Sequence, residues 1–253
     1  MKRFSRGIYE ARLAETPADV EAAQRLRHAA FIAGRRGAVI DVARADGRDA
    51  DHLDEICDHM LVEERKTGRL VCCFRMMPLA SGADIDRTYS AQYYDLDALR
   101  DYPSPMVEMG RFCILPGLKD PDILRVAWGA MTAYVDEKGV EMLFGCSSFD
   151  GTEAEAYMDA FALLKAKHLA PKRWLPRVKA ATIFPFAKRL RIRRPNMKLA
   201  VGRMPPLLRT YLMMGGWVSD HAVVDNDLGT LHVFTGLEIK RVPKARARAL
   251  RGV

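Results

Sequence analysis

The most informative segment of this 253-residue chain is Val107-Glu108-Met109-Gly110-Arg111-Phe112. It lies inside an apolar run, 106–115, whose composition is typical of a strand. On such a strand Glu108 faces the same side as Gly110, and Arg111 faces the other side. An acid and a base at this spacing are costly to bury unless each has a partner. The segment therefore indicates either a catalytic pair or an internal network of ion pairs.

Strand and helix signals alternate on both sides of this segment, which favours an α+β domain built on one sheet. Apolar or alternating runs predict strands at 9–13, 60–64, 70–79, 106–115, 141–146, 218–224 and 231–239, with a hairpin joining the second and third. Helical signals lie at 16–33, 94–100 and 207–214, and two more helices start at 120 and 152. We expect one domain over 1–239 with a basic insertion at about 165–209, and a basic, flexible tail over 240–253.

Three of the expected helices carry N-terminal capping signals. Thr16 and Asp120 are capping residues, and a proline follows each of them in the first turn. Thr152 and Glu155 have the spacing of a capping box.

Charges are divided unevenly along the chain. No Asp or Glu lies between Asp159 and Asp220, whereas that stretch holds 14 of the 40 Lys and Arg residues. The remaining 26 basic residues face 32 acidic ones, so the rest of the chain is net acidic although the whole carries +8. We expect the basic stretch to meet an anionic partner and the acidic part to hold a cationic one.

Composition indicates a globular protein of the cytoplasm. The hydrophobic fraction of 49% and the charged fraction of 28% are ordinary for a soluble domain. The most apolar runs, such as 180–187, are far shorter than the roughly 20 residues that cross a bilayer, and no apolar run follows the first basic residues. The five cysteines lack a metal-binding spacing, so we expect buried thiols, with a catalytic Cys57 near His59 as the alternative.

Several motifs beyond the central segment resemble known N-acyltransferases. The residues that match acyl-homoserine-lactone synthases, which are carrier-protein-dependent relatives of the GNAT acyltransferases, are Arg27, Phe31, Asp54, Asp58, Arg75, Glu108, Arg111 and Phe112. The segments 57–62, 215–225 and 231–236 resemble the ornithine N-alpha-acyltransferases, the first enzymes of ornithine-lipid synthesis. The resemblance covers most of the chain from 8 to 239.

This resemblance implies a GNAT-like α+β fold, with a mixed, splayed sheet and helices on both faces. It implies transfer of a 3-hydroxy fatty acyl group from acyl carrier protein to the α-amine of L-ornithine, which gives lyso-ornithine lipid. Since the 4′-phosphopantetheine arm arrives on the carrier protein, we expect no metal and no cofactor of the enzyme itself. Where ordinary GNAT acetyltransferases cradle the pyrophosphate of coenzyme A, this chain has Asp120 and Asp122, which would repel it.

The resemblance also implies roles for single residues. Glu108 is the expected general base, or the group that orients the amine, and Arg111 accompanies it as a catalytic residue. The expected binding residues for the carboxylate and the second amine of the acceptor are Arg27, Asp54, Asp58, Arg75 and Asp225. Each binding residue is equally compatible with a structural charge. His221 is expected to be a hydrogen-bonded structural residue.

The basic stretch has three interpretations: docking of acyl carrier protein, contact with an anionic membrane, or a solvated face. The expected docking residues are Lys172, Arg173, Lys188, Arg189, Arg191, Arg193 and Arg194. In the membrane interpretation, the apolar residues Phe184, Phe186, Leu190 and Ile192 would contact lipid.

Two rival functions remain open from the sequence. One is an acyl-homoserine-lactone synthase, and the other is a non-enzymatic protein that binds membrane or nucleic acid. The basic stretch has few aromatic residues for stacking and no nucleic-acid motif, so we expect no nucleic-acid partner. The expected location is the cytoplasm, with or without membrane association.

Overall fold

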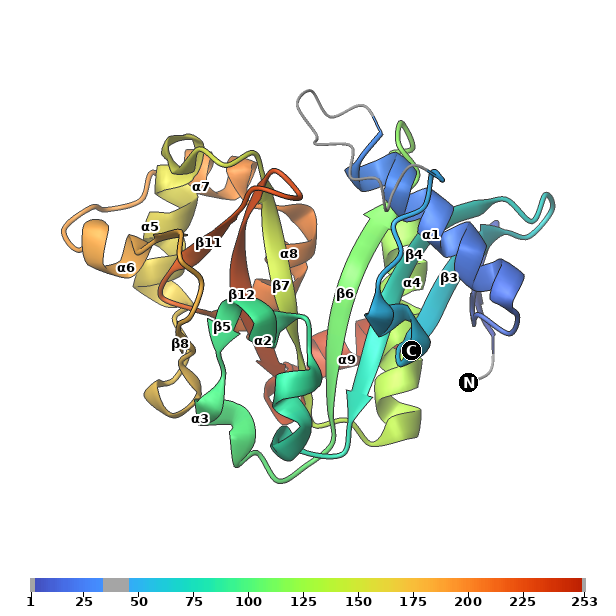
Figure 1. The fold of residues 1–253 in the computed structure, drawn as a ribbon, viewed down its shortest axis with the longest axis horizontal. Helices are drawn as coiled ribbons and strands as arrows, with labels where there is room; N and C mark the ends of the chain where they lie inside the picture. The colour runs from blue at the N-terminus through green and yellow to red at the C-terminus, as the bar shows by residue number, and fades with distance from the viewer. Residues whose placement is uncertain (1–2, 34–45, 252–253) are drawn as a thin grey trace. The chain divides into compact units, whose positions relative to one another are not determined.

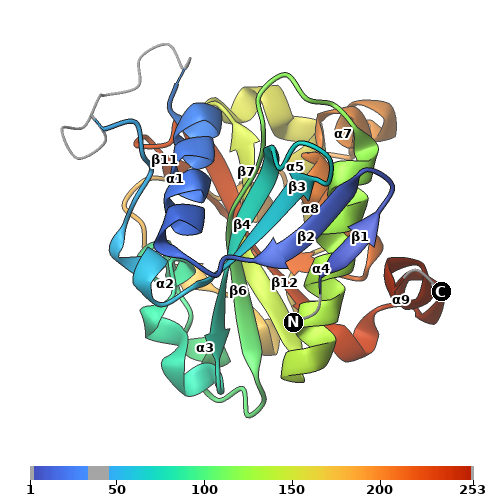
Figure 2. The same ribbon diagram turned by 90° about the vertical axis from the view of Figure 1, so that its right-hand side faces the viewer.

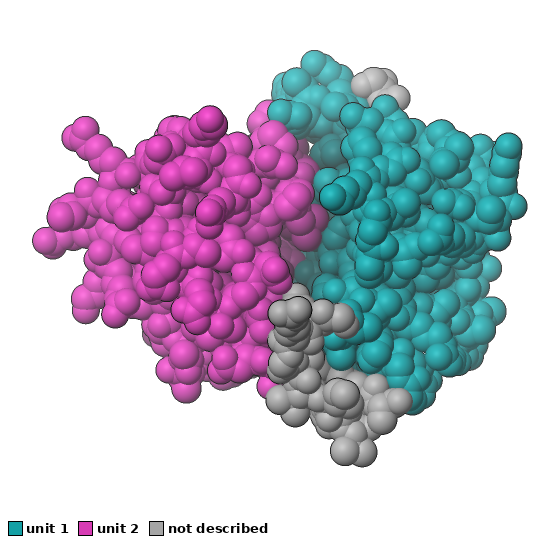
Figure 3. Space-filling model, turned by 90° about the horizontal axis from the view of Figure 1, so that it is seen from above, with its two compact units in different colours: residues 1–78, 107–140, 244–253 teal, residues 79–106, 141–243 magenta. Residues whose placement is uncertain are grey.

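A computed structural model describes residues 3–33 and 46–251 of the chain. The chain divides into two compact units, coloured separately in Figure 3. Unit 1 comprises 1–78, 107–140 and 244–253, and unit 2 comprises 79–106 and 141–243. In the described part of the chain, no helix combines the length and the apolarity that crossing a membrane requires. The boundaries of the expected single domain stay a prediction.

Unit 1 is built on antiparallel strands in the order β1-β2-β3-β4, followed by β6. Its strands are β1 (Phe4–Arg6), β2 (Tyr9–Leu13), β3 (Asp58–Glu64), β4 (Leu70–Leu79) and β6 (Met106–Ile114). Its helical segments are α1 (Pro17–Phe31), the 3-10 turn η2 (His52–Glu55), α4 (Pro121–Lys138) and α9 (Lys244–Arg251). The predicted strands of this part, and the hairpin that joins β3 to β4, are confirmed.

The two long helices of unit 1 cover opposite faces of these strands, as Figures 1 and 2 show. Neighbouring residues along a strand point to opposite faces of the sheet. Cys73 of β4 pairs with Leu61 of β3, three residues after Asp58, so Cys73 and Asp58 lie on opposite faces. On one face the Cys73 thiol contacts the Ala23 carbonyl of α1 at 3.6 Å. On the other face the Tyr134 hydroxyl of α4 donates to Asp58 at 2.6 Å. Helices on both faces were expected, and this part of the prediction is confirmed.

Both predicted caps of these helices are present. The Thr16 side chain accepts a hydrogen bond from the Asp19 amide at 3.2 Å, and Asp120 accepts one from the Asp122 amide at 2.9 Å. Each cap satisfies a backbone donor that has no partner within the helix. The helices therefore begin where the local sequence places them.

Unit 2 contains β7 (Met142–Asp150) in the strand order β7-β12-β11-β9, all antiparallel, with β10 also paired to β12. The other strands are β5 (Tyr94–Asp95), β8 (Arg177–Val178), β9 (Ile183–Phe184), β10 (Trp217–Val218), β11 (Ala222–Asp225) and β12 (Thr230–Glu238). Its α-helices are α2 (Ser90–Tyr93), α3 (Asp97–Arg100), α5 (Met158–Lys167), α6 (Phe186–Arg189), α7 (Met197–Arg203) and α8 (Pro206–Met213). Its 3-10 turns are η3 (Gly82–Arg87), η4 (Ala154–Tyr157), η5 (Lys172–Trp174) and η6 (Ile239–Arg241).

Two predictions in unit 2 hold only in part. The expected strand 218–224 is interrupted, because β10 ends at Val218 and β11 starts at Ala222. The expected helix 94–100 is helical only in α3, after the short strand β5.

The sheet of unit 2 buries both faces in separate apolar clusters. One cluster contains Phe161 of α5 with Phe184, Phe186 and Leu190, all at most 7% exposed. The other contains Tyr94, Phe144 and Phe234. Lipid contact through Phe184, Phe186 and Leu190 was therefore a wrong expectation, because these side chains pack into the core.

The predicted capping box before α5 is also wrong. Residues 154–157 form the 3-10 turn η4, and α5 starts at Met158 without a side-chain cap. The physical reason is the packing of Tyr157, whose hydroxyl donates to the Asp150 carbonyl at 2.6 Å and whose ring lies 4.9 Å from that of Phe149. This tertiary contact overrides the local signal of Thr152 and Glu155.

The C-terminal part, expected as a basic tail from 240, contains α9. Arg251 of α9 pairs with Asp136 of α4 at 2.6 Å, between side chains that are both more than 40% exposed. A surface ion pair of this kind contributes little stability. The flexibility of this tail stays a prediction.

Replacing Phe161 by Ala should lower the free energy of unfolding by about 3–5 kcal/mol, because it leaves a cavity in a cluster where Phe161 is fully buried. Denaturant unfolding measures this change. The matched control is Val178→Ala, at a side chain that is 52% exposed, which should change the free energy by less than about 0.5 kcal/mol. A loss below about 1 kcal/mol for Phe161→Ala would contradict this description of the core.

Candidate functional site

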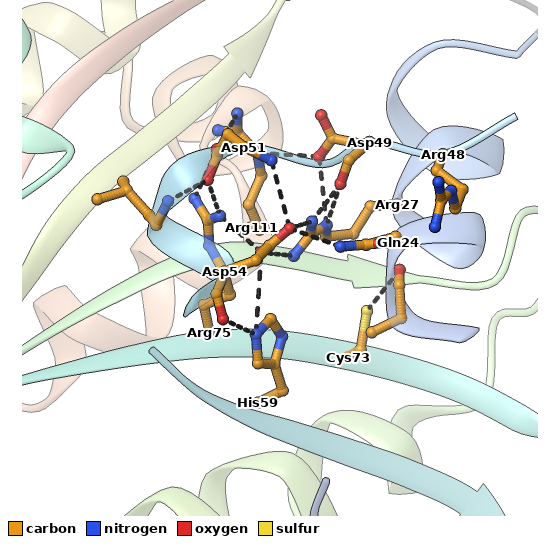
Figure 4. A network of polar contacts seen from close by, with 12 residues as sticks. Gln24, Arg27, Arg48, Asp49, Asp51, Asp54, His59, Cys73, Arg75 and Arg111 are labelled. Carbon is orange, nitrogen blue, oxygen red and sulfur yellow. Dashed lines mark hydrogen bonds and ion pairs between the residues drawn. The ribbon is translucent and has the colours of Figure 1, made fainter. Parts of the chain in front are cut away.

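Six charged side chains gather in unit 1 on the face that α1 covers, as Figure 4 shows. They come from α1, from the segment around η2, from β4 and from β6. They are Arg27, Asp49, Asp51, Asp54, Arg75 and Arg111. We call this set the Arg–Asp network. It contains three guanidinium groups and three carboxylates, so its formal charges balance.

Arg27 and Asp54 form the centre of the Arg–Asp network. The two terminal nitrogens of Arg27 donate to the two carboxylate oxygens of Asp54 at 2.8 and 2.7 Å. Arg27 is 1% exposed, and its Nε also donates to the Asp49 carbonyl at 3.1 Å. This two-pronged geometry joins α1 to η2 with charge-assisted hydrogen bonds.

Arg75 and Arg111 extend the network from the strands. Arg75 donates to Asp54 at 2.8 Å and also binds Asp51, while Arg111 donates through Nε to Asp49 at 3.0 Å. Arg75 is 3% exposed, so its charge is stable only because both carboxylates face it. The segment before β3 is thus fixed to β4 and β6.

The guanidinium groups control the ionisation of the carboxylates. Burial of Asp54 opposes its charged form, but the hydrogen bonds from Arg27 and Arg75 outweigh this effect and hold its pKa well below the usual range. Burial also opposes ionisation of Asp51, and Arg75 and Arg111 lower its pKa in the same way. Both carboxylates are therefore ionised at neutral pH.

Arg111 adopts a left-handed backbone conformation with φ of 54°. Among the described residues it is the one non-glycine residue with positive φ. Such a conformation costs roughly 1–3 kcal/mol and persists only where the surroundings enforce it. The ion pairs of Arg111 with Asp49 and Asp51 hold this conformation in place, three residues after Glu108 on β6.

The sequence predictions named four members of the Arg–Asp network and missed Asp49 and Asp51. Two further residues contact the network: Gln24 donates to Asp54 at 2.9 Å, and His59 Nε2 lies 3.0 Å from the Asp54 carbonyl oxygen. The signal that marks Asp51 is its capping box with Asp54, three residues later in η2.

Glu108, the expected base, lies on β6 and is 5% exposed. Burial is the main cause of the raised pKa of the Cys57 thiol, and the charge of Glu108 adds to it. The catalytic roles expected for Glu108 and Arg111 stay predictions.

The alternative of a catalytic Cys57 finds no support in its surroundings. Burial raises the pKa of the Cys57 thiol to about 12, so the thiolate is scarce at neutral pH. Burial also lowers the pKa of His59, which keeps the imidazole neutral. Cys72, Cys73 and Cys113 are buried thiols as expected.

Two expected binding residues lie outside the Arg–Asp network. Asp58 points to the other face of β3, where it accepts the Tyr134 hydroxyl. Asp225 belongs to unit 2, where it accepts the Leu228 amide at 2.9 Å and closes the turn between β11 and β12. Their roles in binding stay predictions.

The expected docking residues all lie on the surface of unit 2. They are Lys172, Arg173, Lys188, Arg189, Arg191, Arg193 and Arg194. Two of them have acidic partners: Arg173 pairs with Glu238 at 3.1 Å, and Arg193 pairs with Asp159 at 3.2 Å. The surface as a whole keeps an excess of positive charge.

His221 is 1% exposed in unit 2 and pairs through Nδ1 with Asp220 at 2.7 Å. Its backbone carbonyl accepts the Ser219 hydroxyl at 2.7 Å. These bonds fit the hydrogen-bonded structural role expected for it.

Replacing Asp54 by Asn should destabilise the fold by about 3–5 kcal/mol at pH 7, because two buried guanidinium groups lose a charged partner. The folded-state pKa of Asp54 lies below its unfolded value, so its stabilisation is complete above about pH 4 and is lost as the pH falls further. Denaturant unfolding should show the difference between wild type and variant shrinking below about pH 4.

The control is Asp86→Asn, at a carboxylate that is 65% exposed and pairs with Arg100 on the surface. It should change stability by less than about 1 kcal/mol at any pH. A difference for Asp54→Asn that stays constant from neutral to acid pH would show that Asp54 is not an ionised partner.

Comparisons with known proteins match this arrangement. A family model described as an acetyltransferase (GNAT) domain matches residues 26–129, which include the Arg–Asp network and Glu108. A crystal structure of the AHL synthase LasI superposes with a TM-score of 0.50 at 14% identity, over 96% of this chain and 95% of that one. The expected GNAT-like α+β fold is confirmed.

Curated relatives cover almost the whole chain. The L-ornithine N(alpha)-acyltransferase of Rhodobacter capsulatus is 32% identical over 230 residues, which are 89% of this chain and 88% of the relative. That of Brucella abortus is 31% identical over 248 residues, which are 93% of this chain and 86% of the relative. This chain is therefore an acyltransferase and belongs to the family of the L-ornithine N(alpha)-acyltransferases.

Proposed function

We propose that this protein transfers a 3-hydroxyacyl group from acyl carrier protein to the α-amine of L-ornithine and so forms lyso-ornithine lipid. Ornithine as the acceptor is supported by the near full-length similarity to relatives named for ornithine acylation. The donor is inferred from the start of α4, and the chemistry from the buried carboxyl of Glu108 on β6.

The start of α4 supports a donor without a pyrophosphate. A helix N-terminus binds phosphate groups through backbone amides that lack a partner. Here Asp120 already accepts the Asp122 amide at 2.9 Å, and the Tyr9 hydroxyl donates to the other Asp120 oxygen at 3.0 Å. A carboxylate thus occupies the place that a pyrophosphate would need. The pantetheine arm of a carrier protein has a single phosphodiester and suits this start better than coenzyme A.

Glu108 is the group we assign to the amine. The neutral α-amine attacks the thioester carbonyl, a C–N bond forms, and the C–S bond of the pantetheine thioester breaks. The proton released by the amine passes to Glu108, directly or through water, and then to the leaving thiolate. A positioned base of this kind contributes roughly 10² to 10⁴ in rate. The proposed reaction needs no metal and no organic cofactor.

The Arg–Asp network has a supporting role in this proposal. Arg27 and Arg75 are buried and fully engaged with carboxylates, so their first effect is to hold the segment 49–54 against α1 and β4. Asp51 keeps 27% of its side chain exposed, against 6% for Asp54. Asp51 is therefore the member we assign to the cationic side chain of ornithine.

The product would be an amphiphile with one acyl chain and a zwitterionic head. We propose that the enzyme works in the cytoplasm beside an anionic membrane that receives this product. Carrier protein, which is acidic, would dock through the basic surface of unit 2.

Incubating the purified protein with 3-hydroxyacyl carrier protein and a panel of amino acids should give acylated ornithine, detected by mass. The same acyl group on coenzyme A should react with a much lower kcat/KM, because the Asp120 carboxylate already holds the Asp122 amide at the start of α4. Product with another amine and none with ornithine would overturn the acceptor. An equal kcat/KM with coenzyme A would overturn the donor.

Replacing Glu108 by Gln should lower kcat by roughly 10² to 10⁴ while the KM for carrier protein changes little, because the amide keeps the shape but accepts no proton. Steady-state kinetics measure both constants. The control is Glu155→Gln at an exposed position of η4, which should keep wild-type kinetics. A Glu108→Gln enzyme with wild-type kcat would remove Glu108 from the chemistry.

A further inference from the structure

Exposed apolar side chains are concentrated in one short part of unit 2. Ile192 is 89% exposed, and Met197, Leu199 and Val201 are between 43% and 49% exposed. Leaving an isoleucine almost fully in water forgoes the stabilisation that its burial would give. Exposed apolar side chains that gather in one turn and the helix after it are a feature of interaction surfaces.

The backbone around Ile192 is fixed by α5. The Lys165 ammonium donates to the carbonyls of Leu190, Arg191 and Arg193 at 2.6 to 3.2 Å. Asp159, one turn and a half earlier on the same helix, accepts from the Asn196 amide at 3.0 Å. Ile192 is therefore presented to solvent by a built turn between α6 and α7. Figure 1 shows α6 and α7 beside α5.

The charges around these apolar side chains have one sign. Lys188, Arg189, Arg191, Arg193, Arg194, Lys198 and Arg203 are all basic, and no acidic residue lies between Asp159 and Asp220. Only one of these seven, Arg193, has an acidic partner among the contacts described for them. The surface therefore combines exposed apolar side chains with an excess of positive charge that could bind an anionic partner.

We infer that Ile192, Met197 and Val201 insert into the headgroup region of an anionic membrane, while Arg191, Arg194 and Lys198 contact lipid phosphates. We call these six residues the insertion surface. Met197 and Val201 are four residues apart on α7 and so lie on one face of that helix. The inference deepens the proposed function, since an amphiphilic product must reach a bilayer. Of the four apolar residues that the sequence suggested for lipid contact, only Ile192 is exposed. The insertion surface keeps Ile192 and, from the expected docking residues, Arg191 and Arg194.

A lipid surface fits these groups better than a folded partner does. Apolar side chains that project from a turn and a short helix, ringed by Lys and Arg, match the interfacial pattern in which apolar groups enter the acyl boundary and cations meet anionic headgroups. Docking of carrier protein, proposed above for the wider basic surface of unit 2, uses the cations but does not require an isoleucine that is 89% exposed.

Co-sedimentation with vesicles of phosphatidylglycerol and phosphatidylcholine tests the inference. The wild type should bind these vesicles and should bind pure phosphatidylcholine weakly. The double variant Ile192→Ser with Val201→Ser should bind at least about tenfold more weakly, since two apolar insertions are lost. The matched control is Val178→Ser, at an exposed valine of β8 outside the insertion surface, and should bind like the wild type.

A second pair of variants tests the charges. Arg191→Gln with Lys198→Gln should weaken binding to the anionic vesicles by roughly fivefold per residue, and the effect should fade at high salt. Arg209→Gln, at an exposed basic residue of α8, is the matched control. These variants also test the inference if the serine variant does not fold.

Three results would overturn the inference. They are no binding of the wild type to anionic vesicles, wild-type binding by both sets of variants, and an equal loss in the Val178→Ser control. A fourth would reassign the surface: a higher KM for carrier protein without vesicles, together with unchanged vesicle binding, would make it a protein-docking site. Because vesicle binding needs neither ornithine nor carrier protein, a failure of the proposed reaction would leave this test intact.

Discussion

The buried pair of Arg27 and Asp54 is the interaction on which the rest of unit 1 depends. A guanidinium group that is 1% exposed is tolerable only if carboxylates meet it in good geometry. The hydrogen bonds from Arg27 to Asp54 join α1 to η2. Asp54 also accepts a hydrogen bond from Arg75, which links the same segment to β4. The segment that precedes β3 is therefore held in place by charge as well as by the burial of Leu53.

Backbone strain at Arg111 follows from the same constraint. Its positive φ is maintained by Asp49 and Asp51, which are themselves oriented by Arg27 and Arg75. Glu108 lies three residues earlier on the same strand, which Arg111 fixes to the segment 49–51. Mutually paired charges suit positioning, because each group already has its partner before a substrate arrives.

The acid-free stretch of unit 2 serves two physical purposes. Phe184, Phe186 and Leu190 complete a core around Phe161, whereas Ile192 a few residues later is left in water by a turn that Lys165 fixes. Apolar residues that are neighbours in the sequence thus have opposite environments. The positive charge of this stretch is common to both parts and is available to anionic partners.

The sequence by itself determined the features that depend on near neighbours. The caps at Thr16 and Asp120, the hairpin of β3 and β4, and the uneven charge follow from local pattern, and the family follows from motifs along the chain. Only the tertiary structure decided which charges pair, which apolar residues are exposed, and that the packing of Tyr157 replaces a capping box by a 3-10 turn. Alternation along a strand gives the face of a residue, but its partner is set by segments that the fold brings together from far apart in the chain.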